Sequence, residues 1–379
     1  MKHSKKMSLA FAATAAVTGL VLSGCASSTP DAEPEAGELT PVKLQLQWLT
    51  QAQFAGYYAA LDQGFYEDEG LDVEIIQGGG DIVPQDALAA GDVDYAISWV
   101  PKVLGSIQNG ANITDVAQIF ERSATLQVSF KDSGIDSVAD LAGKTIGSWG
   151  YGNEWELYAG LNKAGITDDV TVVSQAFDMS ALLSGDIDAA QAMTYNEYAQ
   201  LLETENPETG ELYTADDFNV IDWNVEGTSM LQDAIWADTA KLDDEAYADQ
   251  TVAFIKASIK GWAFARDDAE AAAGIVTAAG STLGTSHQLW MTNEVNKLIW
   301  PSTTGGVGTI DEAAWAATVD MALKTSNETG ATIITEEPPA TAYSNEYVEK
   351  ALAELTEEGI DVVGSDFAPL SVTLNPAGA

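Results

Sequence analysis

The sequence has 379 residues, with 16 Lys and Arg against 58 Asp and Glu, so its formal net charge is −42. The length fits one large or two medium domains, and an apolar fraction of 46% supplies enough side chains for a buried core. The negative charge repels phosphate backbones, so we expect no nucleic-acid partner. One Cys and two His form neither a disulfide framework nor a set of zinc or haem ligands. The composition therefore predicts a folded protein without a metal or a cofactor.

Residues 1–24 have the pattern of a signal peptide, because lysines precede a short apolar run over 7–22. That run is shorter than the roughly 20 residues that a membrane-spanning helix needs. It ends in Leu22-Ser23-Gly24-Cys25, which resembles a bacterial lipobox. The resemblance implies cleavage before Cys25 and lipidation of its thiol. The alternative is a signal peptide that happens to contain a Cys.

Residues 25–40 have the composition of a linker. Pro, small residues and acids follow one another without any hydrophobic period, as in a flexible tether. We therefore expect an extracytoplasmic protein that is anchored to the cell membrane by its lipid, with the folded part beginning near residue 41.

Beyond the linker, predicted strands alternate with predicted helices. Residues 42–48 alternate between apolar and polar side chains, which is typical of a half-buried strand. The pattern continues with a helix over 52–63, a strand over 71–76, a helix over 82–90 and a strand over 95–99. This βαβαβ order predicts an α/β protein with a mostly parallel sheet covered by helices. It also places a ligand crevice at the carboxyl ends of the strands.

A sequence pattern that occurs twice predicts two similar lobes. In both 87–96 and 181–190, a helix ends at Gly, an acidic turn follows and a buried strand begins. Two copies are too few for a solenoid and fit two Rossmann-like lobes with a ligand cleft between them. We expect the first lobe over 41–132, the second over 133–229, and a return to the first lobe with C-terminal helices and a tail over 230–379.

Residues 47–58 (QWLTQAQFAGYY) and 64–73 (GFYEDEGLDV) resemble the opening of NMT1/THI5-like (SsuA/THI5) substrate-binding proteins. Further similar stretches are Asp140-Leu141-Ala142-Gly143-Lys144, Phe177-Asp178, Ala192-Met193-Thr194-Tyr195-Asn196-Glu197, Lys260-Gly261-Trp262 and Leu298-Ile299-Trp300-Pro301. The resemblance implies a type II periplasmic-binding-protein fold. It also implies a monomer that captures one small molecule and delivers it to the permease subunits of an ABC importer.

Within that family, the sequence is most similar to branches that take up flat vitamin-type heteroaromatics. These are thiamine pyrimidine precursors or riboflavin, and the residues do not decide between them. More distant relatives bind aliphatic sulfonates, nitrate or bicarbonate, so an anion is the alternative ligand. Free N–H groups where 147–152 leads into a helix suit an anion, but Glu154 and Glu156 in the first turn would repel it.

Candidate ligand residues lie mainly at the predicted strand ends, where the crevice is expected. Aromatic faces there could hold a flat ring, at roughly 0.5–1.5 kcal/mol per aromatic pair beyond burial, although each ring could instead belong to the core. The candidates in the first lobe are Trp48, Gln51, Phe54, Tyr57, Gly79, Asp81, Ser98, Trp99 and Arg122. Those in the second lobe are Trp149, Tyr151, Asn153, Tyr195, Glu197 and Trp223. We expect Glu197 to accept from an exocyclic amine, a protonated ring nitrogen or ribityl hydroxyls.

We predict that the protein is not an enzyme. Gly143-Lys144-Thr145 resembles the end of a P-loop, but Val138 occupies the upstream position that requires Gly. The sequence has no Gly-x-Ser-x-Gly elbow. Related pyrimidine synthases need a reactive His and a Cys-rich motif, whereas beyond the signal peptide only His287 and Cys25 are present. An adhesive or structural lipoprotein is a third possibility, which the aromatic residues at strand ends disfavour.

Overall fold

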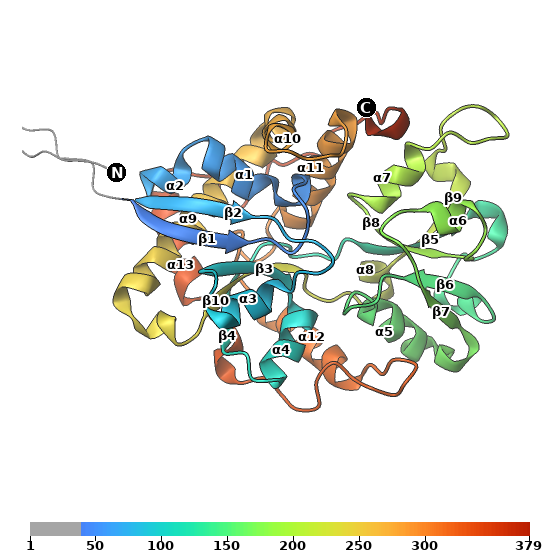
Figure 1. Cartoon of the computed structure of the whole chain (residues 1–379), viewed down its shortest axis with the longest axis horizontal. Helices are drawn as coiled ribbons and strands as arrows, with labels where there is room; N and C mark the ends of the chain where they lie inside the picture. The colour runs from blue at the N-terminus through green and yellow to red at the C-terminus, as the bar shows by residue number, and fades with distance from the viewer. Residues whose placement is uncertain (1–38) are drawn as a thin grey trace, which may run out of the picture. The chain divides into compact units, whose positions relative to one another are not determined.

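The computed structural model describes residues 39–379, in which two α/β lobes lie beside each other (Figure 1). The predicted signal peptide, Cys25 and nearly all of the predicted linker lie outside the described residues. The sheet of the first lobe has the order β2-β1-β3-β10-β4. Its strands are β1 (Thr40–Gln45), β2 (Leu71–Ile76), β3 (Tyr95–Trp99), β4 (Ile113–Gln118) and β10 (Asp233–Asp238).

The parallel part of this sheet agrees with the βαβαβ prediction. β1 pairs in parallel with both β2 and β3, whereas β10 runs antiparallel to β3 and β4. The strands predicted over 71–76 and 95–99 are confirmed. β3 lies between β1 and β10, so it is buried on both faces and shows no alternation. The strand predicted over 42–48 ends earlier, at Gln45, which leaves the next residues free to approach a ligand.

Helices cover both faces of the first sheet (Figure 1). They are α1 (Ala55–Asp62), α2 (Phe65–Asp68), α3 (Pro84–Ala90), α4 (Val100–Gln108), α9 (Glu245–Asp267), α10 (Ala269–Ala278), α11 (Thr285–Ile299), α12 (Glu312–Lys324) and α13 (Glu346–Glu357). α1 and α9 approach closely because both carry Gly at their contact. A Cβ atom on Gly261 would lie 1.9 Å from the carbonyl oxygen of Gly56, so a larger residue would push the helices apart.

The second lobe contains an antiparallel sheet, β8-β5-β9, and a parallel pair, β6-β7. Its strands are β5 (Thr125–Phe130), β6 (Thr145–Ser148), β7 (Thr171–Ser174), β8 (Ala190–Met193) and β9 (Phe218–Asp222). Its helices are α5 (Trp155–Ala164), α6 (Ser180–Leu183), α7 (Glu197–Leu202) and α8 (Trp223–Glu226). A bridge between Ile146 and Ala189 joins the two strand groups. Single 3-10 turns lie at Ala52–Phe54, Lys131–Ser133, Val138–Leu141, Thr167–Asp169, Ala215–Asp217, Lys241–Asp243, Ala340–Ala342 and Pro376–Gly378.

The structure corrects the predicted start of the second lobe. β5 was expected in the first lobe, whose predicted end is residue 132, but it pairs with β8 and β9 of the second. The first crossing therefore lies over 119–124, between β4 and β5. The return crossing lies over 227–232, between α8 and β10. The error arose because the partners of β5 follow it by dozens of residues and leave no local signal.

The two copies of the repeated pattern, 87–96 and 181–190, make the same hydrogen bonds. Gly91 and Gly185 both adopt the left-handed backbone that ends a helix. Next, the Asp94 carboxylate accepts from the Lys43 backbone N–H at 2.9 Å, and the Asp188 carboxylate accepts from Thr145 at 2.7 Å. In each lobe, the repeated acidic residue thus satisfies an amide of the neighbouring parallel strand.

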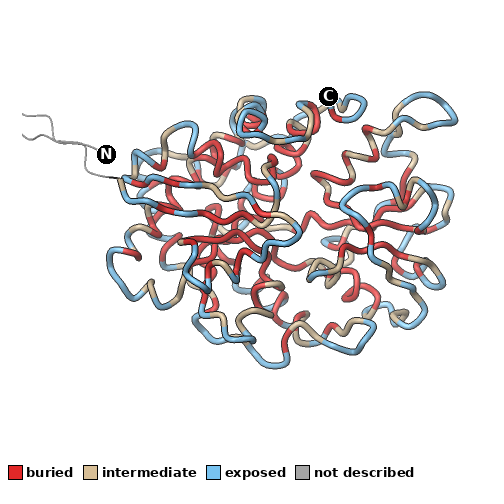
Figure 2. Tube along the Cα trace, in the orientation of Figure 1, coloured by how far each residue is buried: buried red, intermediate tan, exposed pale blue. Residues whose placement is uncertain are grey.

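Burial follows the strands of both lobes (Figure 2). The largest hydrophobic cluster joins the first sheet to α1, α9 and α11, and separate clusters lie on each side of the sheet in the second lobe. From Leu39 to Ala379, no helix is both long enough and apolar enough to span a bilayer.

Candidate functional site

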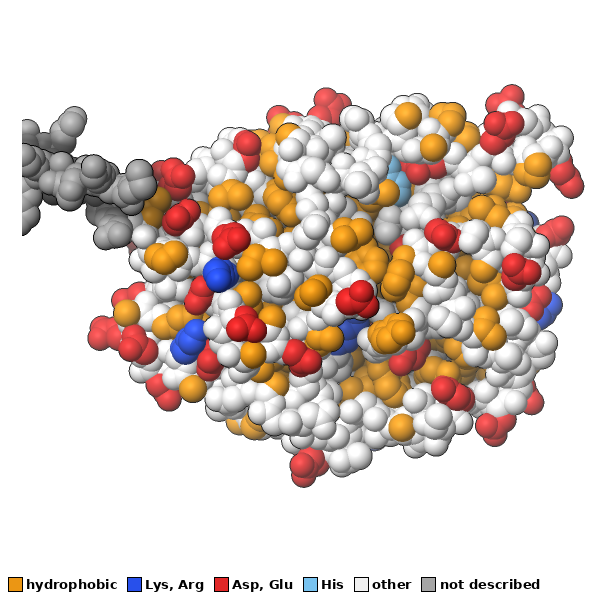
Figure 3. Space-filling view, in the orientation of Figure 1, with side chains coloured by type: hydrophobic (Ala, Val, Ile, Leu, Met, Phe, Trp, Pro, Cys, Tyr) orange, Lys and Arg blue, Asp and Glu red, His pale blue; other side chains and the backbone are white. Residues whose placement is uncertain are grey.

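A cavity of about 550 Å³ lies between the two lobes. This volume falls in the range of roughly 300–1,000 Å³ that is usual for small-molecule sites. The walls come from segments that follow β1, β2 and β3 of the first lobe and β6, β7 and β8 of the second. Hydrophobic side chains gather on the visible face where the lobes meet, while acidic side chains are scattered around it (Figure 3). The cavity is therefore at the strand ends, where the topology predicted a crevice.

The structure brings most of the predicted ligand residues together at this cavity. The lining residues among them are Trp48, Gln51, Gly79, Asp81, Ser98, Trp99, Trp149, Tyr151, Asn153, Tyr195 and Glu197. They come from both lobes, so any ligand that contacts the whole set must bridge the interlobe boundary.

Phe54 and Tyr57 do not line the cavity, contrary to expectation. Both side chains are buried in the core of the first lobe. Tyr57 packs edge-to-face against Trp262, with ring centroids 5.5 Å apart. α1 turns Tyr57 toward α9, and Phe54 lies in the 3-10 turn before α1, within the same core, so neither belongs to the site.

Arg122 and Trp223 also lie away from the cavity. Arg122 donates to the backbone carbonyls of Leu298 and Pro301, and so supports the first crossing rather than a ligand. Trp223 is fully buried in the second lobe, where it packs against Gly160. Both residues are thus structural in this arrangement.

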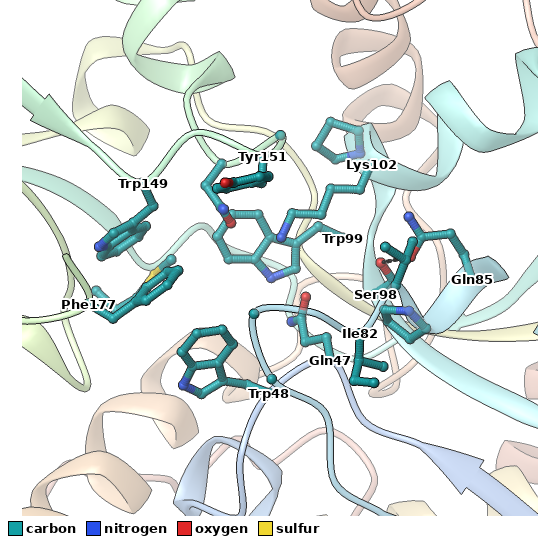
Figure 4. A pocket seen from close by; sticks show the side chains of 18 of the residues that line it. Gln47, Trp48, Ile82, Gln85, Ser98, Trp99, Lys102, Trp149, Tyr151 and Phe177 are labelled. Atoms are coloured by element: carbon teal, nitrogen blue, oxygen red, sulfur yellow. Dashed lines mark hydrogen bonds between the residues drawn. The ribbon is translucent and has the colours of Figure 1, made fainter. Parts of the chain in front are cut away.

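An aromatic wall spans the two lobes (Figure 4). The ring centroids of Trp48, from the first lobe, and Phe177, from the second, are 4.5 Å apart. Phe177 also stacks on Trp149, at 6.2 Å and an interplanar angle of 24°. Sequence reasoning did not single out Phe177 as a site residue, although Phe177-Asp178 is one of the stretches that resemble the family. Its role depends on an interlobe contact that no local pattern reveals.

Tyr151 lies at the mouth of the cavity. It is 87% exposed and has a φ angle of 54°, which is uncommon for a residue with a side chain. Its neighbours Gly150 and Gly152 also have positive φ angles, so this short loop turns sharply after β6. The turn holds an exposed aromatic ring beside the opening, where a bound flat ligand could cover it.

Asp233 is the common hydrogen-bond acceptor of three side chains that line the cavity. Its carboxylate accepts from Gln47 Nε2 at 2.5 Å, from Gln53 Nε2 at 3.0 Å and from Trp99 Nε1 at 2.7 Å. All three donors line the cavity. Gln51 donates to Gln53 at 2.8 Å, which extends the network. Burial raises the pKa of Asp233 to about 7, despite the hydrogen bonds that favour its ionised form.

Lys102 brings a cation to the cavity, a feature that sequence reasoning missed. Its ammonium lies 4.6 Å from the centroid of Trp99, and its stem packs against Gly152 of the second lobe (Figure 4). Burial lowers the pKa of Lys102 to about 8, while Asp233 and Glu154 act in the opposite direction. Within residues 39–379, the ammonium has no hydrogen bond or salt bridge. It is therefore available to a ligand that carries an acceptor.

Glu197 supplies a carboxylate on the second-lobe side. It is 4% exposed, and its oxygens accept from the Met193 backbone N–H at 3.0 Å and from Asn196 Nδ2 at 2.8 Å. Burial raises the pKa of Glu197 to about 7. Burial raises the pKa of the Tyr195 hydroxyl far above its usual value. The nearby carboxylates of Asp233 and Glu197 raise it further.

A third buried acid lies at the crossings. The carboxylate of Glu156 accepts from Ser123 Oγ at 2.9 Å and from the Met230 backbone N–H at 2.6 Å. Burial raises the pKa of Glu156 to about 7 as well. The three acids Glu156, Glu197 and Asp233 therefore bind protons in the folded chain at pH values where an unfolded chain would release them.

This difference predicts that the protein is more stable in mild acid than in mild base. Between the ordinary acid pKa of about 4 and about 7, the folded state binds more protons, so the free energy of unfolding falls as pH rises. Each pKa unit corresponds to about 1.4 kcal/mol. We expect the melting temperature at pH 8 to lie about 5 °C below that at pH 5.5. Thermal unfolding of the wild type and of Glu156→Gln tests this, since the variant should show a shallower dependence. A melting temperature that rises toward pH 8 would contradict the assignment.

The sequence matches one family model and several curated proteins. A family model described as "NMT1/THI5 like" matches residues 51–272. The chain is 26% identical, over 64% of its length and 71% of the relative's, to the formylaminopyrimidine-binding protein of Halalkalibacterium halodurans. It is 30% identical, over 52% of its length and 56% of the relative's, to the riboflavin-binding protein RibY of Chloroflexus aurantiacus. The chain spans 48%, 71% and 56% of the length of three curated relatives, and between 34% and 46% of three others.

The fold is also similar to solved structures. The periplasmic aliphatic sulphonate binding protein SsuA of Escherichia coli superposes with a TM-score of 0.56 over 88% of this chain and 92% of that one, at 15% identity. At this identity the likeness establishes the fold alone, which is the predicted α/β periplasmic-binding-protein fold. Because the family model covers more than half of the sequence, the chain belongs to the NMT1/THI5-like family.

Proposed function

We propose that the chain is the extracytoplasmic substrate-binding lipoprotein of an ABC importer, and that its lobes close as a monomer on one small, flat heteroaromatic vitamin or vitamin precursor. The aromatic wall of Trp48, Phe177 and Trp149, built from both lobes, is the observation that carries this proposal. A flat ring that lies against this wall would gain both burial and stacking. Capture would then proceed by hinge closure and not by bond chemistry.

The polar groups of the cavity suit a ring with both donors and acceptors. Glu197 would accept from an exocyclic amine or a hydroxyl, and Lys102 would donate to a carbonyl or formyl oxygen. Formylaminopyrimidine and riboflavin each offer both kinds of group. The names of two relatives support the same class, since one binds a formylaminopyrimidine and the other binds riboflavin.

An aliphatic sulfonate is the second candidate. It is favoured by Lys102, the only cation among the described residues that line the cavity. However, Asp81 and Glu197 line the same cavity, and their carboxylates would repel an anion. An extended aromatic wall would also gain little from a small aliphatic chain. We therefore place the heteroaromatic ligand first.

A thermal-shift screen of the protein separates these candidates. The panel contains riboflavin, aminopyrimidines including formylaminopyrimidine, thiamine, taurine, nitrate and bicarbonate. A ligand at 100 times its dissociation constant stabilises the folded state by about 2.7 kcal/mol, which raises the melting temperature by a few degrees. A response to riboflavin or a pyrimidine supports the proposal. A response to taurine or nitrate alone would keep the transport role and reject the aromatic ligand.

Removal of the cavity cation should weaken ligand binding. We expect Lys102→Met to lower the affinity for riboflavin or formylaminopyrimidine about tenfold, because a charge-assisted hydrogen bond to a ring acceptor is lost. The folded state should not lose stability, since burial already disfavours this ammonium. Calorimetric titration measures the effect, with Lys324→Met on the exposed face of α12 as the matched control. Equal affinities of the wild type and Lys102→Met would exclude Lys102 from ligand contact.

The proposed anchor gives a separate prediction about location. Cys25→Ala should move the protein from the membrane fraction to the soluble fraction of cells, because no lipid can then be attached at that thiol. Immunoblotting of the two fractions measures the change. Continued retention of Cys25→Ala in membranes would require a different anchor, without affecting the ligand site.

A further inference from the structure

His287 links the two lobes next to the cavity without lining it. The side chain belongs to α11 of the first lobe and is 1% exposed. Its Nδ1 lies 2.8 and 3.1 Å from the two carboxylate oxygens of Glu203, and its Nε2 lies 3.1 Å from Oδ1 of Asn196. Both partners belong to the second lobe, at opposite ends of α7. One imidazole thus holds both ends of that short helix.

The amide of Asn196 has a defined orientation. Its Nδ2 donates to the Glu197 carboxylate at 2.8 Å, and its Oδ1 also accepts from Gln200 at 3.3 Å. If the amide were reversed, its oxygen would face the Glu197 carboxylate, which is possible only if Glu197 is protonated. The second oxygen of Glu197 accepts from the Met193 backbone N–H, a contact that suits an ionised carboxylate.

This orientation determines the protonation of His287. The Glu203 carboxylate on one side of the ring and Asn196 Oδ1 on the other are both acceptors, so both ring nitrogens must donate. Glu203 is the titratable side chain that contacts the ring, and Glu197 is linked to the ring through Asn196. Gly378 of the C-terminal 3-10 turn packs closely against Cβ of His287 and against the Glu203 carboxylate.

We propose that His287 is a positioning residue of the ligand site: as an imidazolium held by Glu203, it fixes the Asn196 amide, whose Nδ2 in turn orients the Glu197 carboxyl group at the cavity. His287 acts through Asn196 and does not touch the ligand. Because the ring and its partners belong to different lobes, the arrangement is complete only when the lobes are together. The consequence for ligand binding rests on the proposed function, whereas the protonation state of His287 does not.

Imidazole nitrogen NMR tests the protonation state without a ligand. The sequence contains only His3 and His287, so the full chain with His3→Gln gives a single imidazole signal. At pH 7 we expect both nitrogens of His287 to carry protons. Glu203→Gln should convert the ring to a neutral form, while Glu205→Gln, an exposed acid two residues away, should leave it unchanged. A neutral His287 ring in the chain that carries only His3→Gln would overturn the proposal. This measurement leaves the residues around His287 unchanged.

A double-mutant cycle tests the link to the ligand, with formylaminopyrimidine as the probe. Glu203→Gln and Glu197→Gln should each lower the affinity about tenfold, and the double variant should resemble Glu197→Gln alone. Additive losses would show that Glu203 and His287 do not act through Glu197, and would overturn the positioning role. If neither formylaminopyrimidine nor riboflavin binds the wild type, the proposed function fails, and the NMR result decides on the imidazolium by itself.

Discussion

Asp233→Ala is expected to abolish ligand capture and to lower the melting temperature by several degrees. The carboxylate is 2% exposed and accepts from Gln47, Gln53 and Trp99, so its removal leaves three donors without their acceptor. Each unsatisfied buried donor costs about 1–3 kcal/mol. The same donors line the cavity, and their loss of orientation should disturb the binding surface as well as the fold. Thermal unfolding and calorimetric titration measure the two effects.

The conservative variant Asp233→Asn separates stability from orientation. Asn keeps one acceptor oxygen for Trp99 and Gln47, and Gln53 can turn its amide to accept from the new NH2 group. We therefore expect a smaller loss of stability than in Asp233→Ala. Asp249→Ala, on the exposed surface of α9, is the matched control and should change neither measurement. If Asp233→Ala bound riboflavin or formylaminopyrimidine as tightly as the wild type does, the network under the cavity would have no part in recognition.

Trp48→Ala should lower ligand affinity at least about tenfold while the fold remains intact. The indole supplies the first-lobe face of the aromatic wall, 4.5 Å from Phe177, and its loss removes both burial and an aromatic contact. It lies beyond the end of β1 at Gln45, so the strand pairing does not depend on its side chain. Leu49→Ala changes an exposed neighbour that does not line the cavity and serves as the control. Unchanged affinity in Trp48→Ala would remove the wall from the binding site.

The sequence predicted the elements whose causes are local. β2 and β3 have the predicted bounds, because period-two patterning marks β2, and the helix that ends at Gly91 marks the approach to β3. The two-lobed plan was also visible, since Asp94 and Asp188 serve the same role in matching turns. By contrast, β5 was assigned to the wrong lobe. Its pairing partners, β8 and β9, are separated from it by most of the second lobe.

The site was predictable to the extent that topology decides it. Residues at or shortly beyond the ends of strands, such as Trp48, Ser98 and Trp149, line the cavity because parallel strand ends meet at one edge. Tyr57 was misassigned because the direction in which a short helix faces depends on what packs against it. Asp233 was missed because its partner Trp99 lies 134 residues earlier in the chain, and only the return of β10 brings them together.

The most direct test of the proposed function is a fluorescence titration of the intrinsic tryptophans with riboflavin and formylaminopyrimidine, each compared with taurine. Trp48, Trp99 and Trp149 line the cavity, so a flat ring that enters it should quench their emission in a saturable way. We expect one of the two heteroaromatics to give saturable quenching and Trp48→Ala to weaken it, while taurine has no effect. Saturable quenching by taurine, with none by either ring compound, would contradict a heteroaromatic ligand in this cavity.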